Sequence, residues 1–315
     1  MNLDAPLVES AIESKPIVVS PQTPLLDVIG LMNQRRVNIK SDSENNSQSS
    51  CSCVLVRSGK ELLGIFTERD IVRLTAKNVD LERLKIAEVM IQPVITLDKS
   101  ALNDIFAALF LFRRYRIRHL PILDDENQII GIVSPESIRK VLRPDNFLKM
   151  RRVADVMTNK VISAPTTASV LETAQLMAEH RVSCVVITLN GEGEDWQSVS
   201  TNPVGIITER DIVQFQALQM NLAEVQAQTV MSSPLFLLSP EDSLWTAHQE
   251  MQRRHIRRLV VSWNWGQGLG IVTLTSLLRI FDPIEMYSVI QTLQQTIEQL
   301  ETEKAQLLKQ LSVNS

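Results

Sequence analysis

One short sequence occurs twice in this chain, and two shortened forms of it occur as well. Gly64–Asp70 reads Gly-Ile-Phe-Thr-Glu-Arg-Asp, and Gly205–Asp211 differs from it at one position. Gly131–Ser134 and Gly270–Thr273 begin in the same way. The four glycines recur at intervals of about 65–75 residues, which is too long for a helical solenoid and suits a small α+β unit. We therefore predict four copies of one unit.

Each copy shows the same order of secondary-structure signals. A short β-rich run comes first, and a cluster of Ser, Thr, Asp and Pro after it predicts a turn and a helix N-cap. An amphipathic helix, a hydrophobic strand, a second strand with the Gly-Ile motif and a closing helix follow. The predicted order is therefore β-α-β-β-α in every copy. The β-rich runs are Pro16–Val19, Pro93–Thr96, Lys160–Ser163 and Pro234–Leu237, and the first helices are Leu25–Arg35, Leu102–Arg114, Val170–His180 and Leu244–Arg254.

This order, with a glycine, a Thr or Ser and an Asp at fixed spacing, resembles the CBS domain, and two consecutive CBS domains form a Bateman module. The resemblance implies an α+β fold in which paired domains pack sheet to sheet and form two clefts that commonly bind adenosine-containing ligands. It also implies a regulatory protein that is not an enzyme. The expected division is a tail (1–9), four CBS repeats (10–80 with a polar insertion at 40–50, 86–143, 144–220 and 226–282) and a final helix (283–315).

Composition argues against several other classes of protein. A length of 315 residues suits about two globular units, which two modules satisfy. The formal net charge of −4 argues against nucleic acid as the main partner. No apolar run approaches the ~20 residues that span a bilayer, Met1–Ser14 lacks a signal-peptide core, and three cysteines fit a reducing compartment. We expect a cytoplasmic protein without membrane contact, catalytic residues, metal or cofactor, since no P-loop or metal-ligand spacing occurs.

The two complete motifs carry the groups that a ribose site needs. A carboxylate can accept hydrogen bonds from both ribose hydroxyls, and charge-assisted bonds of this kind are strong. The resemblance assigns ribose to Asp70 and Asp211, with Thr67 and Thr208 beside them. Each Asp could instead cap the following helix, and capping does not exclude a ligand. The second and fourth copies have Ser137 and Ser276 at this position, so we expect one good nucleotide site per module.

Basic residues show the reciprocal distribution. The second and fourth copies carry them just before the core strand, where the resemblance predicts contact with the phosphates of a ligand held by the partner domain. The alternative is that these charges are solvated at a helix C-terminus, where the helix dipole favours cations. The candidate phosphate-binding residues are Arg116, Arg118 and His119 in copy two and His255, Arg257 and Arg258 in copy four.

The resemblance implies that the adenine base lies against the first β-run of the domain that carries the Asp. The candidates are Ile17, Val18, Val19, Val161, Ile162 and Ser163, although most of them would be buried in any case. Cys51 and Cys53 form a C-x-C pair, but Cys53 aligns with Cys184 on the same strand position. That alignment favours small core residues over a metal half-site.

The segment after Pro283 has a heptad pattern. Ile290, Ile297, Lys304 and Leu311 fall at a positions, and Leu293, Leu300 and Leu307 at d positions. Ile at a with Leu at d favours a parallel dimer, so we predict a homodimeric coiled coil over 286–311. The alternative is one helix that packs back on the last repeats.

We therefore predict a regulatory protein that binds an adenine nucleotide, resembling AMP, ADP or ATP, and transmits its state through the dimeric helix to a downstream signalling domain or protein. A CBS scaffold that binds proteins without a ligand is the alternative.

Overall fold

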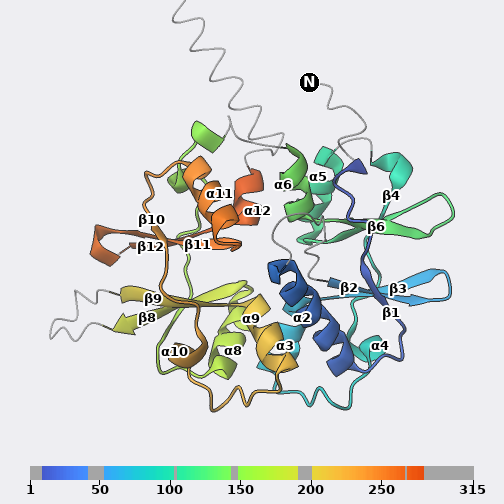
Figure 1. Ribbon diagram of the computed structural model, residues 1–315, viewed down its shortest axis with the longest axis horizontal. Coiled ribbons are helices and arrows are strands. Elements are labelled where there is room, and N and C mark those ends of the chain that lie inside the picture. The colour runs from blue at the N-terminus through green and yellow to red at the C-terminus, as the bar shows by residue number, and fades with distance from the viewer. Residues whose placement is uncertain are drawn as a thin grey trace, which may run out of the picture.

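The computed structural model describes residues 9–41, 53–102, 105–142, 148–190, 201–266 and 268–279. These residues form four three-stranded sheets with their helices (Figure 1). The predicted coiled coil at 286–311 and most of the polar insertion at 40–50 lie outside the described residues.

Each repeat contributes one sheet and two main helices. Repeat one comprises β1 (Ile17–Val19), α2 (Leu25–Ser41), β2 (Cys53–Ser58), β3 (Glu61–Thr67) and α3 (Glu68–Ala76). Repeat two comprises β4 (Leu97–Asp98), α5 (Ile105–Tyr115), β5 (Leu120–Leu123), β6 (Ile129–Val133) and α6 (Pro135–Leu142). Repeat three comprises β7 (Ser163–Pro165), α8 (Val170–His180), β8 (Cys184–Asn190), β9 (Thr201–Thr208) and α9 (Glu209–Ala217). Repeat four comprises β10 (Leu237–Leu238), α11 (Leu244–Arg253), β11 (Arg258–Trp263), β12 (Gly268–Thr273) and α12 (Leu274–Leu278). Short helical turns connect them: α4 (Ile86–Val89), η1 (Lys99–Ala101), η2 (Val153–Asp155), α10 (Ala227–Val230) and η3 (Asn264–Gly266).

The sheet topology is the same in all four repeats and confirms the predicted β-α-β-β-α order. The first strand pairs parallel to the second, and the second pairs antiparallel to the third. The predicted runs Pro93–Thr96, Lys160–Ser163 and Pro234–Leu237 are largely wrong as strands, because ladder pairing begins only at Leu97, Ser163 and Leu237.

The central strand of each sheet is buried on both faces. In β2, Val54 and Val56 pack among the helices of repeat one, while Cys53 and Leu55 face the sheet of repeat two. Side chains alternate between the faces of a strand, so burial on both sides explains the continuous apolar run. Cys184 takes the same place in repeat three, and Cys53 and Cys184 are both buried, as expected for core residues.

The repeats pair within each half of the chain by exchanging the segments that precede their sheets. Glu13, which precedes the sheet of repeat one, forms a β-bridge with Ile132 in β6 of repeat two. Ile91, which precedes the sheet of repeat two, forms the reciprocal β-bridge with Ile65 in β3 of repeat one. Repeats three and four exchange the same bridges through Thr158–Ile271 and Ser232–Ile206. The chain therefore forms two modules, one from repeats one and two and one from repeats three and four.

The motif glycine makes room for this exchanged segment. A Cβ atom on Gly64 would lie 2.4 Å from Sδ of Met90, and one on Gly205 would lie 2.2 Å from Sδ of Met231. Both methionines come from the segment that leads into the partner repeat. The glycines thus permit close packing between paired repeats.

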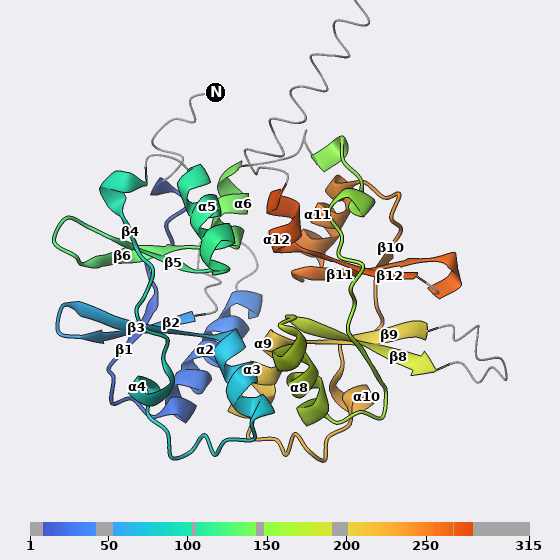
Figure 2. The ribbon, with the colours of Figure 1, turned by 180° about the vertical axis from the view of Figure 1, so that it is seen from behind.

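The two modules lie side by side, with repeat one against repeat three and repeat two against repeat four (Figures 1 and 2). Val72 of α3 belongs to the core of repeat three, and Val213 of α9 belongs to the core of repeat one. Gln216 donates from Nε2 to Oγ1 of Thr75 at 2.9 Å across the same contact. The sequence-distant halves therefore share buried surface.

Among the described helices, none has the length and apolarity to cross a membrane.

Candidate functional site

Asp70 lies at the start of α3, in the third helical position. Thr67 is the N-cap residue, and its backbone N–H and hydroxyl donate to Oδ2 of Asp70 at 3.0 and 2.7 Å. Asp70 therefore supports the cap from within the helix and is not itself the N-cap, which corrects the alternative considered from the sequence. Nη1 of Arg73 approaches the other oxygen, Oδ1, at 3.2 Å.

The other three repeats keep this geometry, repeat three with a carboxylate and repeats two and four with a serine hydroxyl. In repeat three, Thr208 donates from its N–H and hydroxyl to Oδ2 of Asp211 at 2.9 and 2.8 Å. In repeat two, the N–H of Ser134 donates to Oγ of Ser137 at 2.9 Å. Thr273 and Ser276 repeat this contact at 3.2 Å in repeat four. The position therefore supports a helix N-cap in every repeat, but only repeats one and three place a carboxylate there.

A cleft of about 250 Å³ lies between repeats one and two, beside Asp70. It brings together the predicted ribose residues Thr67 and Asp70 and the predicted phosphate residues Arg116, Arg118 and His119. Burial raises the pKa of Asp70, and the hydrogen bonds from Thr67 and the charges of Arg73 and Arg69 offset only part of this rise. The sequence therefore located both charged sides of one cleft.

The apolar wall of this cleft differs from the prediction. Ile91, Pro93, Val94 and Ile95 line it, together with Ile65 of β3. Ile17, Val18 and Val19 form β1 and are not among its lining residues. The reason is the exchange of lead-in segments, which places the β-rich run of repeat two beside the motif of repeat one.

The second module contains the counterparts of these residues in repeats three and four. Arg258 donates from Nε to Oγ of Ser183 at 2.9 Å, so the basic segment of repeat four reaches repeat three as predicted. His255 is exposed at φ 53° after α11, as Arg116 is at φ 54° after α5. Of the predicted base residues, Val161 and Ile162 pack against the cores of the module, and Ser163 begins β7. Their contact with a base stays a prediction.

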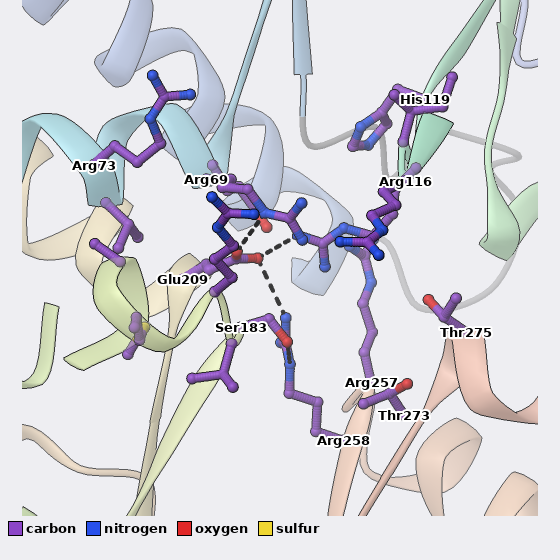
Figure 3. Close-up of a pocket in the computed structure, with 18 of the residues that line it drawn as sticks. Arg69, Arg73, Arg116, His119, Ser183, Glu209, Arg257, Arg258, Thr273 and Thr275 are labelled. Carbon is purple, nitrogen blue, oxygen red and sulfur yellow. Dashed lines mark hydrogen bonds and ion pairs between the residues drawn. The ribbon is translucent and has the colours of Figure 1, made fainter. Parts of the chain in front are cut away.

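A larger cavity of about 1060 Å³ lies where all four repeats meet (Figure 3). Its wall includes eight Arg and Lys side chains and four Glu side chains, although the whole chain carries a net charge of −4. The cavity and the cleft share Glu68, Arg69, Arg73, Arg116, Ile117, Arg118 and His119. The cleft beside Asp70 therefore opens toward a region of concentrated positive charge.

Glu209 is the centre of an ion-pair network in this cavity (Figure 3). Its carboxylate meets Nη2 of Arg118 at 2.5 Å, Nε of Arg69 at 3.4 Å and Nη2 of Arg258 at 3.6 Å. These arginines come from repeats two, one and four, whereas Glu209 is the first residue of α9 in repeat three. The side chain is 1% exposed. Burial alone would raise the pKa of Glu209, but the charges of the three arginines outweigh it and hold the pKa below its ordinary value.

His119 is neutral in this surrounding. Burial, together with the positive charges of Arg118, Arg257 and Arg69, lowers the pKa of His119 to about 3. A neutral imidazole can still donate one hydrogen bond, and an anion placed beside it would favour the charged form.

Two parts of the site were missed from the sequence. The Ile91–Ile95 wall was visible as the β-rich run of copy two, but its place beside copy one depends on the exchange. The signal for Glu209 was that both complete motifs contain a Glu at the same place, at positions 68 and 209. In the described part of the chain, no group of three or more His, Cys, Asp or Glu side chains is placed to hold a metal ion.

A sequence model of the family described as CBS domain matches residues 8–77, 86–144, 153–217 and 227–282. Among solved structures, protein MJ1225 from Methanocaldococcus jannaschii, described as a proposed archaeal homolog of g-AMPK, has a TM-score of 0.69 at 20% identity. The match covers 87% of this chain and 99% of that one. At this identity the likeness concerns the fold alone.

Two further relatives match part of the chain. Uncharacterized protein MK0525 from Methanopyrus kandleri is 34% identical over 129 residues, which are 41% of this chain and 61% of that protein. The match therefore spans less than two thirds of this relative. The CBS domain protein PAE2072 from Pyrobaculum aerophilum, solved with AMP, is 25% identical and covers 45% of this chain and 99% of its own, with a TM-score of 0.36.

Proposed function

Because this chain belongs to the CBS domain family, we propose that it is a non-catalytic regulatory protein that binds adenosine nucleotides in the clefts of its two modules. The ligand class is a nucleoside with one to three phosphates, resembling AMP, ADP or ATP. The first module carries the best-defined site.

The observation that supports this proposal is the composition of the cleft beside Asp70. One cleft combines a buried carboxylate, an apolar wall at Ile91–Ile95 and the cations Arg116 and Arg118. A nucleotide presents a diol, a flat base and an anion, and these groups match the three surfaces. Pockets for such ligands usually measure about 300–1,000 Å³, and this cleft of 250 Å³ shares walls with the cavity of 1060 Å³.

Each side chain then has one role. Asp70 accepts hydrogen bonds from the ribose hydroxyls, and Thr67 fixes its carboxylate from the other side. Arg116, Arg118 and His119 contact phosphate. In the second module, Asp211 and Thr208 take the ribose, and His255, Arg257 and Arg258 supply the phosphate contacts.

Calorimetric titration tests this function on the full chain with adenosine, AMP, ADP, ATP and GMP. We expect adenine nucleotides to bind with about two sites per chain, and GMP to bind more weakly. Absence of binding by every nucleotide would contradict the proposal and favour the ligand-free scaffold.

We further propose that the chain is a homodimer through residues 286–311 and signals to a partner through this helix. The heptad of Ile and Leu supports the proposal. Leu300→Lys places a charge in the seam, whereas Gln299→Lys adds the same charge beside it. Sedimentation should show monomers for the first variant and dimers for the second and for the unchanged chain. A monomeric unchanged chain would contradict this proposal.

A cytoplasmic location completes the proposal. It is supported by the buried thiols of Cys53 and Cys184 in the described part of the chain, which suit a reducing compartment.

A further inference from the structure

Arg118 lies between two spaces. Its side chain lines both the cleft beside Asp70 and the central cavity. It is the second of the three basic residues that immediately precede β5. It faces repeat one of its own module across the cleft, and it contacts Glu209 in repeat three of the other module. A group bound in the cleft and a group in the cavity can therefore compete for the same guanidinium.

The protein already supplies an anion on the cavity side. Oε2 of Glu209 lies 2.5 Å from Nη2 of Arg118, and Arg69 and Arg258 hold the same carboxylate at 3.4 and 3.6 Å. Burial alone would lower the pKa of Arg118, but the charge and the hydrogen bond of Glu209 outweigh it and raise the pKa. The contact is thus a charge-assisted pair between a buried carboxylate, 1% exposed, and a guanidinium side chain that is 29% exposed.

This contact is specific to Glu209. Glu68 occupies the same first helical position in repeat one, but it pairs with Arg210, whose Nε lies 3.5 Å from Oε1 of Glu68. Arg257 occupies the position of Arg118 in repeat four, and it pairs with Glu136 of repeat two at 2.5 Å. Both arginines hold a carboxylate of the other module, but of these two arginines Arg118 borders the cleft beside Asp70 and Arg257 does not.

We propose that Glu209 is an internal competitor for Arg118, which a phosphate group in the first cleft must displace. Two anions on one guanidinium repel each other, so phosphate binding weakens the hold of Arg118 on Glu209. Glu209 thereby lowers the affinity for phosphate-bearing ligands relative to adenosine, and its release signals occupancy of the first module to the second. This inference rests on the proposed nucleotide function, which it deepens.

The test compares ligands with and without phosphate. All chains in this test carry Asp211→Ser, so that only the first cleft keeps the carboxylate of its motif. Calorimetry measures the affinities of adenosine and of ADP for the chain with Glu209 and for Glu209→Gln. Glu209→Gln removes the competing charge, so ADP should bind about tenfold more tightly, as expected for one charge-assisted hydrogen bond, while adenosine stays unchanged. Glu136→Gln is the matched control, because it removes a carboxylate from the same cavity but from Arg257. It should leave both affinities within about twofold.

Hydrogen exchange gives a second readout. ADP, but not adenosine, should speed exchange of the amides at the start of α9 in the chain with Glu209, and this effect should disappear with Glu209→Gln. If Glu209→Gln prevents folding, Glu209→Asp keeps the charge and withdraws it by one methylene, and ADP should then also bind more tightly.

The outcomes separate the two proposals. If ADP and adenosine both fail to bind the chain with Glu209, the proposed function fails. If both bind and the ratio of their affinities stays the same with Glu209→Gln, or changes equally with Glu136→Gln, the competition between Glu209 and phosphate is overturned and the nucleotide site remains.

Discussion

Nη2 of Arg118 in repeat two lies 2.5 Å from Oε2 of Glu209 in repeat three, so two side chains 91 positions apart join the two modules. Glu209 is almost fully buried, and such a carboxylate costs free energy unless it is paired. The contact therefore belongs to the stability of the assembled chain as well as to its site.

A double-mutant cycle measures how much the contact between Arg118 and Glu209 contributes to the free energy of unfolding. Arg118→Gln should lower the free energy of unfolding by about 1–3 kcal/mol at pH 7, because a buried charge loses its nearest partner. Glu209→Gln in the same chain should recover part of this loss, giving a coupling of about 0.5–3 kcal/mol. Arg114→Gln, at an exposed site of the same segment, should change little. Additive effects in urea unfolding would show that the two residues act independently.

His119 should make stability depend on pH. Its folded pKa of about 3 lies below the ordinary value of 6.5, so the unfolded chain binds more protons between these values. The contribution of His119 is therefore fully present above pH 6.5 and is lost as pH falls toward 3.

The variant His119→Gln isolates this contribution from the titration of other groups. The unchanged chain should lose up to about 1.4 kcal/mol more stability per pH unit than His119→Gln over this range. His180→Gln, at an exposed imidazole at the end of α8, should follow the unchanged chain. Parallel curves of unfolding free energy against pH for the unchanged chain and His119→Gln would contradict the lowered pKa of His119.

The fold was largely predictable because the sequence patterns that specify its helices and strands are local and occur in four copies. The helix predicted over Val170–His180 has those bounds, and Ser169 of the turn cluster before it is its N-cap, as predicted. The strand prediction at Pro93–Thr96 failed for a physical reason. That run is apolar because it lines the cleft beside repeat one. Its pattern of apolar residues does not distinguish a segment that lines a cleft from a strand that pairs in a sheet.

The site was predictable only in part. Asp70 and Arg118 were placed in one cleft because a resemblance supplied the pairing of repeats one and two. The ion pairs of Glu209 depend on how the two modules pack, and no local pattern encodes that arrangement. The motif glycine shows the same limit, since its neighbour Met90 belongs to the exchanged segment that leads into the partner repeat.

Gly64→Ala should destabilise the first module. The new Cβ atom would lie 2.4 Å from Sδ and 2.7 Å from Cγ of Met90, so a loss of about 1–3 kcal/mol in the free energy of unfolding is expected. Adding Met90→Ala should recover much of this loss.

Gly30→Ala is the control for the same substitution. No atom lies within 4 Å of a Cβ at this helical position, so the change should stabilise the chain by about 0.5–1 kcal/mol. Equal effects of the two glycine substitutions would refute close packing as the role of Gly64.

The central claim is that the carboxylate of Asp70 holds the ribose hydroxyls. The chain itself offers the best variant, because Ser137 preserves the helix cap at the equivalent position without a charge. Asp70→Ser should therefore remove the ligand contact and keep the fold, as a thermal unfolding curve can verify.

The most direct measurement compares the affinities of AMP and of 2′,3′-dideoxy-AMP by calorimetry. Each ligand is titrated into the chain with Asp70 and into Asp70→Ser, and both chains also carry Asp211→Ser. With Asp70, removal of the hydroxyls should weaken binding by about 10–100-fold, the range for hydrogen bonds to a charged group. With Asp70→Ser, the two ligands should bind alike. An equal loss on removal of the hydroxyls in both chains would show that the ribose is held elsewhere and would contradict the account.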